Sequence, residues 1–291
     1  MPFLALVLAM ALWASTFVVL KLVFTEVSPL WVICARMWVA ALALGLCYRF
    51  WGKASYRKGD WRLLLAMSLA EPCLYFVFEA KALLYTSAGQ AGMVTAVLPL
   101  LTVAGAVLFL KEKASLRLWL GLGMALVGVL WLSAGGEASL DAPNPWLGNA
   151  LELVAMLCAS LYSLSLKYLS DRYSPLWLTA IQAISGALFF LPLALWSAPW
   201  PGQVSSQALG AMLYLGLGVT LGAYGLYNFA MARLAAAKVA IFVNLIPLFS
   251  LLLAMGLLDE RLSPNQWVAS ALVLAGVLVS QGNKDRALET A

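Results

Sequence analysis

The stretch "KLVFTEVSPLW" at residues 21–31 is repeated in part as "KYLSDRYSPLW" at residues 167–177, and five of the eleven positions are identical. These matches share an offset of 146 residues. Four later matches share an offset of 148 residues: Pro99 with Pro247, Glu112 with Glu260, Trp119 with Trp267, and Gly128 with Gly276. One insertion of two residues therefore aligns the first half of the chain with the second, which indicates an internal duplication.

The composition predicts an integral membrane protein. Hydrophobic residues make up 64% of the chain and charged residues 11%, whereas soluble domains contain about 45–50% apolar and about 25% charged residues. Three Ser-Pro pairs, at 28–29, 174–175 and 263–264, predict helix starts with a capping serine before a proline in the first turn. Ten apolar stretches approach or exceed the roughly 20 residues that a membrane-spanning helix needs: 2–22, 30–50, 62–84, 88–110, 115–134, 146–168, 175–197, 207–231, 235–257 and 264–282.

The duplication and the ten stretches together predict the architecture. The two copies are predicted to be five-helix units at residues 1–134 and 146–282, followed by a polar tail at 283–291. Because five is an odd number, the second unit must cross the membrane in the opposite orientation to the first. Transporters use such inverted pairs to build a site between two halves near the bilayer midplane. The predicted fold is all-α, with ten transmembrane helices arranged as two inverted repeats around a central cavity.

The basic residues predict the orientation. If the N-terminus is cytoplasmic, fourteen of the eighteen Lys and Arg residues fall on the cytoplasmic side, three fall outside, and Arg36 lies within a span. The positive-inside rule therefore predicts that both termini are cytoplasmic. The bases are not gathered on one amphipathic face, so no nucleic-acid partner is expected. The lipid bilayer is the expected surrounding.

Few residues are available for enzyme chemistry. The chain has no histidine, and its four cysteines lie inside predicted spans without CxxC spacing. Zinc sites rich in histidine and Ser-His or Cys-His nucleophile pairs are therefore absent from the sequence. The connectors are too short for a soluble catalytic domain. We expect no enzyme activity, no metal and no cofactor.

Several motifs carry a resemblance to a known family. They are "ALWASTFVVLK" at 11–21, "LKEK" at 110–113, "LDERLSPNQW" at 258–267, and a "GVL" in the last span of each half. With the duplicated five-span unit, the chain resembles the drug/metabolite transporter superfamily in its ten-helix EamA-type branch. Within that branch, its length and aromatic-rich spans are most similar to the YddG-type aromatic amino acid exporters. The resemblance implies a bacterial inner-membrane protein, shaped like a basket, whose central cavity opens alternately to each side.

Four ionisable residues inside spans are candidates for function because charges in the membrane are costly. Arg36 and Glu79 lie at similar depth and could pair, either as a structural lock or at the substrate. Glu71 lies mid-span beside Pro72, which can kink the helix. Its carboxyl is either a proton carrier or a neutral, hydrogen-bonded acid, and we favour a neutral acid in a facilitator. Glu152 is shallower and is expected to snorkel.

Uncharged polar residues that lie away from the membrane interfaces complete the predicted cavity. Ser15, Ser163 and Tyr227 are polar residues of this kind, in addition to the cavity residues named below. Pro99 and Pro247 hold equivalent positions in the two halves, and equivalent helix interruptions point to a transporter site. The predicted cavity residues are Trp13, Thr16, Arg36, Glu71, Tyr75, Glu79, Thr95, Pro99, Tyr162, Gln182, Tyr224, Asn228, Asn244 and Pro247.

The predicted function is secondary transport by alternating access. The expected substrates are small organic solutes, above all amino acids with aromatic or other apolar side chains, which are exported. A multidrug carrier and a nucleotide-sugar or metabolite carrier of the same superfamily are the alternatives, and a channel is a third. Glycine-rich faces in the spans at 115–134 and 207–231 leave a homo-oligomer open.

Overall fold

The computed structural model describes residues 1–110, 116–136, 138–234, 239 and 242–281. Glu112, most of the "LKEK" motif and the predicted tail at 283–291 lie outside the described residues.

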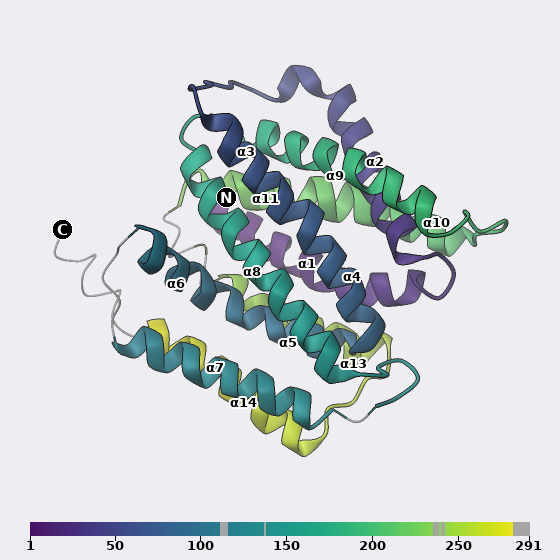
Figure 1. Ribbon diagram of the computed structural model, residues 1–291, viewed down its shortest axis with the longest axis vertical. Coiled ribbons are helices and arrows are strands. Elements are labelled where there is room, and N and C mark those ends of the chain that lie inside the picture. The colour runs from purple at the N-terminus through teal and green to yellow at the C-terminus, as the bar shows by residue number, and fades with distance from the viewer. Residues whose placement is uncertain (111–115, 137, 235–238, 240–241, 282–291) are drawn as a thin grey trace.

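The described chain is helical, and its elements follow the predicted spans (Figure 1). Three irregular helical segments interrupt the longer runs: η2 (Leu69–Leu74), η3 (Thr95–Val97) and η4 (Tyr214–Ala223). A short turn of helix, η1 (Tyr48–Phe50), follows α2. The α-helices are α1 (Pro2–Val23), α2 (Pro29–Leu46), α3 (Asp60–Ser68), α4 (Tyr75–Tyr85), α5 (Ala88–Val94), α6 (Leu98–Leu110), α7 (Leu116–Ala134), α8 (Pro145–Leu169), α9 (Pro175–Ser197), α10 (Ser206–Leu213), α11 (Tyr224–Met231), α13 (Leu245–Leu257) and α14 (Pro264–Gln281).

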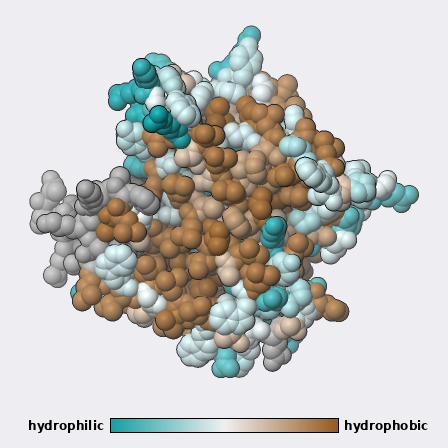
Figure 2. Space-filling view, in the orientation of Figure 1, coloured by the Kyte–Doolittle hydropathy of each residue, from teal (hydrophilic) through white to brown (hydrophobic). Residues whose placement is uncertain are grey.

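Seven helical runs in the described residues are long and apolar enough to cross a membrane. Three shorter apolar helices, Trp119–Ala134, Leu245–Leu257 and Pro264–Val279, occupy the places of the other three predicted spans. Apolar side chains cover the middle of the face seen in Figure 2, and most polar residues gather toward its edges. Such a surface needs lipid around it, because soluble monomers rarely expose large apolar patches. The protein is therefore a multi-pass membrane protein.

The three predicted Ser-Pro helix starts are present, with one difference in capping. Pro29, Pro175 and Pro264 begin α2, α9 and α14. The hydroxyls of Ser174 and Ser263 accept a backbone N–H three residues on, at 3.3 Å in each case. The hydroxyl of Ser28, by contrast, is buried and has no hydrogen-bond partner among the described residues.

Loops on one side of the bundle tie the two sequence copies together. Arg172 contacts Asp60 at 2.7 Å, and the Tyr173 hydroxyl donates to the same carboxylate at 2.9 Å. Burial, followed by this bond to Asp60, raises the pKa of Tyr173 to about 12. An isolated β-bridge joins Ala54 to Tyr173. These contacts hold the start of α3 against the connection between α8 and α9.

Helices α7 and α14 pack side by side through two glycines, Gly128 and Gly276, which match at the 148-residue offset (Figure 1). A Cβ on Gly276 would lie 2.6 Å from the Gly121 carbonyl oxygen and 2.7 Å from the Ala125 nitrogen. Both are backbone atoms and cannot rotate away. The close approach of α7 and α14 therefore requires glycine at 276.

We expect Gly276→Ala to lower the thermal stability of the protein in detergent, because overpacking costs about 1–3 kcal/mol. Gly123→Ala on α7 is the matched control, since nothing lies within 4 Å of its added Cβ. The melting temperatures of the two variants are measured by size-exclusion chromatography after heating at increasing temperatures. Equal melting temperatures for the two variants would show that α7 and α14 do not pack in this way.

Candidate substrate cavity

A cavity of about 590 Å³ lies among the helices of both sequence copies. This figure includes space that is open to solvent, and the room for water-sized molecules within it is about 50 Å³. The described residues that line it are Trp13, Thr16, Phe17, Arg36, Glu71, Tyr75, Phe76, Glu79, Thr95, Leu98, Met156, Ala159, Tyr162, Ser163, Tyr224, Tyr227, Val243 and Ile246.

Nine of the fourteen predicted cavity residues lie on this wall: Trp13, Thr16, Arg36, Glu71, Tyr75, Glu79, Thr95, Tyr162 and Tyr224. Ser163 and Tyr227 of the wider polar set also line it. The structure places the other five predicted residues elsewhere: Pro99, Gln182, Asn228, Asn244 and Pro247.

Gln182 and Asn228 lie behind the wall and hold Tyr162. The Tyr162 hydroxyl lies 3.0 Å from the Asn228 Oδ1 and 3.2 Å from the Gln182 Oε1. The Asn228 Nδ2 donates to the Thr179 hydroxyl at 2.9 Å. The two amides therefore fix the orientation of a wall residue, which is a positioning role.

Pro99 and Pro247 lie in the first turns of α6 and α13, where a missing N–H costs no helical hydrogen bond. The 3₁₀ turn η3 precedes α6, and a turn at Asn244 precedes α13. Each proline follows a residue of the cavity wall, Leu98 or Ile246. The helix interruption predicted at equivalent positions is thus present in both halves, but the prolines themselves do not face the cavity.

The helix break at Glu71 is the strongest irregularity at the cavity. Glu71 has φ −147° and ψ 119° inside η2, and the Glu71-Pro72 peptide bond is cis. The residue before a proline is pushed out of the α region by a steric clash. The break turns the Glu71 carboxyl into the cavity, where it accepts a hydrogen bond from the Tyr224 hydroxyl.

Arg36 and Glu79 both line the cavity but form no salt bridge with each other in the described part of the chain. The Arg36 guanidinium lies over the Phe76 ring at 4.4 Å from its centroid, and Nε donates to Thr220 at 3.1 Å. The Tyr75 hydroxyl donates to Glu79 Oε1 at 2.8 Å. The direct pair predicted from matched depth is absent from the described structure, and the guanidinium lies on the Phe76 ring instead.

Three polar atoms of cavity-lining residues have no hydrogen-bond partner in the described structure: Trp13 Nε1, Arg36 Nη1 and Glu79 Oε2. Arg36 is 1% exposed and Glu79 is 3% exposed. Buried polar groups are nearly always hydrogen-bonded. A basic and an acidic side chain that each keep one unpartnered polar atom beside a cavity fit a ligand that carries the two opposite charges.

Glu152 differs from its prediction. Its side chain is 0% exposed and does not snorkel to the interface, and neither carboxyl oxygen has a hydrogen-bond partner within the described ranges. The prediction rested on the position of Glu152 near the end of its predicted span, from which its carboxyl could reach the membrane surface. The packing of α8 against α4 covers this position instead.

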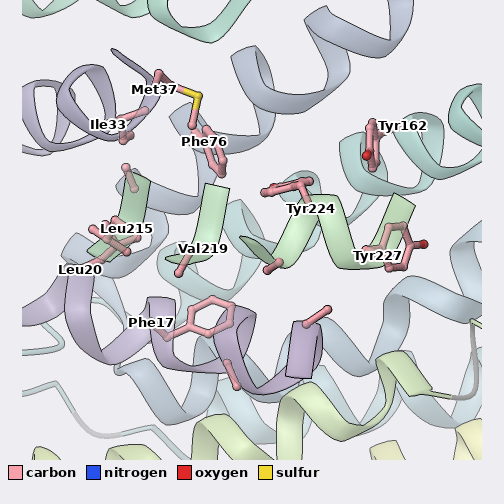
Figure 3. Packing of buried hydrophobic residues seen from close by; sticks show 14 of the residues in the cluster. Phe17, Leu20, Ile33, Met37, Phe76, Tyr162, Leu215, Val219, Tyr224 and Tyr227 are labelled. Atoms are coloured by element: carbon pink, nitrogen blue, oxygen red, sulfur yellow. The ribbon is translucent and has the colours of Figure 1, made fainter. Parts of the chain in front are cut away.

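Aromatic rings form much of the remaining wall. The ring of Trp13 lies 5.1 Å from that of Tyr224 and 4.8 Å from that of Tyr227, measured between centroids. Tyr162 lies 6.3 Å from Tyr224 in an edge-on arrangement. Figure 3 shows these tyrosines near one another above Phe17 of α1. Such offset and edge-on contacts are the favoured geometries of aromatic groups.

The lining residues that were not predicted are all apolar: Phe17, Phe76, Leu98, Met156, Ala159, Val243 and Ile246. Their spacing carries a weak signal, since Met156, Ala159 and Ser163 recur at three and four residues on one face of α8. A membrane helix that is apolar on every side offers no contrast between its lipid face and its cavity face.

Matching positions of the two copies line the cavity. Of the eighteen described lining residues, fourteen form seven pairs at the two repeat offsets. The pairs at 146 residues are Trp13 with Ala159, Thr16 with Tyr162 and Phe17 with Ser163; those at 148 are Phe76 with Tyr224, Glu79 with Tyr227, Thr95 with Val243 and Leu98 with Ile246.

A multi-pass helical protein in which both halves line a central cavity has an architecture that is common among membrane transporters. The model of the EamA-like transporter family matches residues 1–134 and 146–281, and the chain belongs to that family, within the drug/metabolite transporter superfamily.

Two related transporters match this chain over almost its whole length. The uncharacterized transporter YetK of Bacillus subtilis is 27% identical, and the match covers 96% of this chain and 86% of YetK. A probable terminal-alkyne amino-acid exporter of Streptantibioticus cattleyicolor is 25% identical, with 94% and 91% covered. A solved crystal structure matches with a TM-score of 0.69 at 21% identity and covers 98% of each chain, which shows the fold.

Proposed function

We propose that the protein is a secondary transporter that exports amino acids with aromatic or other apolar side chains through this cavity by alternating access. The observation that carries the proposal is the combination of an aromatic wall with two charged side chains of opposite sign, each of which has one unpartnered polar atom. Arg36 Nη1 can receive a carboxylate, and Glu79 Oε2 can receive an ammonium group. The name of the Streptantibioticus cattleyicolor relative also supports an amino acid as substrate.

The two copies supply different chemistry to the proposed site. The charged lining residues Arg36, Glu71 and Glu79 all come from the first copy, whereas both copies supply aromatic rings. The second copy contributes Tyr162, Tyr224 and Tyr227, against which Trp13 of the first copy packs. A substrate with both charges at one end and a ring at the other would therefore bind in one orientation. In this orientation the charged end faces α2 and α4, and the side chain faces Trp13 of α1 and the tyrosines of α8 and α11.

Alternating access is supported by the seven matched pairs on the cavity wall. In an inverted repeat, exchange of conformation between the two units converts a cavity open to one side into a cavity open to the other. We propose that residues 1–134 and 146–282 are these two units. They would lie in a bacterial inner membrane with both termini in the cytoplasm.

The orientation has a direct test. Ser55 and Ser139 are exposed, one in the loop after α2 and the other before α8. Single cysteines at these positions are expected to react with a membrane-impermeant reagent from the cytoplasmic side and the outside, respectively. Labelling of both positions from the same side would contradict the inverted arrangement.

Counterflow in proteoliposomes tests the substrate class. We expect labelled tryptophan or phenylalanine to exchange, with Trp13→Ala reducing the exchange at least about tenfold, since truncating an aromatic anchor of a binding site costs about 2 kcal/mol or more. Trp196→Ala is the control, because Trp196 is 91% exposed and remote from the cavity wall. Exchange of a nucleotide sugar or a cationic dye, without exchange of amino acids, would replace the proposed substrate by that class.

A further inference from the structure

Glu79 and Glu152 are two buried carboxyl groups whose hydrogen bonding is incomplete. Glu152 has no partner at either oxygen, and Glu79 has one, Tyr75. An ionised carboxylate without donors in an apolar interior is strongly unfavourable. These groups therefore differ from an acid such as Asp60, which Arg172 and Tyr173 satisfy.

The packing of α4 against α8 brings the two carboxyls to the same level. The Asn144 N–H donates to the Tyr85 carbonyl at 3.1 Å, so the start of α8 meets the end of α4. A Cβ on Gly148 would lie 2.9 Å from the Ala82 carbonyl oxygen, so the two antiparallel helices nearly touch there.

The register follows from this contact. Glu152 is one turn from Gly148 along α8, and Glu79 is three residues from Ala82 in the same direction along the bundle. Residues three and four apart share a helix face. Glu79 and Glu152 therefore face each other across a close helix contact.

The charged and titratable neighbours are few. The charged and titratable neighbours of Glu79 are Arg36 on α2, Glu71 on η2 and Tyr75 on its own helix. Those of Glu152 are Glu79 and Tyr75. One guanidinium thus stands among three carboxyls in the described structure. Like charges that face each other in a low dielectric disfavour each other's ionisation.

We propose that Glu79 and Glu152 form a shared proton-binding site whose proton is exchanged for the ammonium group of the substrate. Glu79 lines the cavity and meets the ammonium group, while Glu152 lies behind it and shares the proton. When the ammonium group binds, the proton leaves to water on the side to which the cavity is open. When the substrate leaves on the other side, a proton from that side's water returns to the pair. This inference rests on the proposed function and makes export proton-coupled.

Glu71 is the less suited of the cavity acids. Glu71 and Glu79 each accept one hydrogen bond from a tyrosine, but in the described structure the second oxygen of Glu79 is buried without a partner, and neither oxygen of Glu71 is. Glu152 has no such donor among the residues described, and replacing an unpartnered buried acid by a residue of similar shape should not destabilise the fold. Retention of such a costly group is typical of a functional site.

The proton site can be tested without substrate. Infrared difference spectra of the purified protein in lipid, recorded while the pH is raised, report protonated carboxyls by their C=O band. We expect this band to decrease in the parent, and to be lost or shifted in both Glu79→Gln and Glu152→Gln. Asp171→Asn, which changes an exposed acid between α8 and α9, should leave it unchanged.

The two glutamate variants separate a shared site from independent acids. A shared proton predicts that Glu79→Gln with Glu152→Gln changes the band no more than either alone. An unchanged band in Glu152→Gln, or additive changes, overturns the proposal. If Glu152→Gln gives little folded protein, Glu152→Leu replaces it in the experiment, and the same change of the C=O band is expected.

Coupling is measured in proteoliposomes as the ratio of amino acid accumulation with and without an imposed pH gradient. We expect a ratio above one for the parent and for Asp171→Asn, and a ratio of one for Glu152→Gln. A parent ratio of one, or an unchanged ratio in Glu152→Gln, overturns the coupling. If the parent moves no amino acid at all, the proposed function fails, whereas the infrared result still decides whether the proton site exists.

Discussion

Replacing Arg36 with glutamine is expected to lower the affinity for an amino acid roughly ten- to a hundredfold, because a hydrogen bond to a charged group contributes about 1.5–3 kcal/mol. Arg36 is the one basic side chain among the described residues of the cavity wall. Its Nη1 is unpartnered and therefore free to receive the substrate carboxylate. Equilibrium binding of labelled tryptophan to the purified protein measures the loss.

A matched control exists for the stacked guanidinium. Arg233 lies over the Phe229 ring at 3.7 Å, as Arg36 lies over Phe76, but Arg233 is exposed and distant from the cavity wall. Arg233→Gln should bind substrate as the parent does. Because Arg36 and Glu79 form no ion pair, exchanging the two residues should not restore binding. Restoration by the exchange, or an equal loss in Arg233→Gln, would contradict the assignment.

Glu260→Ala is expected to release the start of α5 from the segment before α14. The Glu260 carboxylate accepts the backbone N–H groups of Ala88 and Gly89, each at 2.8 Å. This contact joins the second sequence copy to the first at one end of the bundle. Losing both charge-assisted bonds costs roughly 3 kcal/mol. The equilibrium between the arrangement in which residue 260 holds the start of α5 and the arrangement in which α5 is released should then shift by about a hundredfold toward release.

Hydrogen exchange of the Ala88 and Gly89 amides measures the release directly. We expect faster exchange across residues 86–94 in Glu260→Ala and no change in Asp259→Asn. Asp259 is an exposed neighbour with φ 52°, a conformation that asparagine tolerates. Unchanged exchange in Glu260→Ala would show that the carboxylate does not hold this end closed.

Much of the helical framework follows from the sequence, because composition and span length constrain a membrane protein strongly. Pro72 marked the broken helix, and the Pro99 and Pro247 pair marked the interrupted segments, since a proline leaves a local backbone signature. The polar residues of the wall could be listed because a polar side chain facing lipid is unfavourable.

The side-chain contacts could not be predicted in the same way. Matched depth placed Arg36 near Glu79, but depth does not reveal that Phe76 offers the guanidinium an aromatic face. Glu152 looked shallow from its distance to the helix end, and only the close approach at Gly148 shows why it is buried. Both outcomes depend on which helix faces meet, and a uniformly apolar helix does not encode its neighbours in its pattern.

The central claim is that substrate crosses the membrane through the cavity as it opens to one side and then the other. Ala159 lines the cavity on α8, and a cysteine there changes little in volume. With the four native cysteines replaced by alanine, a membrane-impermeant maleimide should modify Ala159→Cys when added from either side, and aromatic amino acids should slow the reaction from both. Leu157→Cys, on the exposed face of the same helix, should gain no such protection. Modification of Ala159→Cys from one side only, or at a rate indifferent to amino acids, would contradict the account.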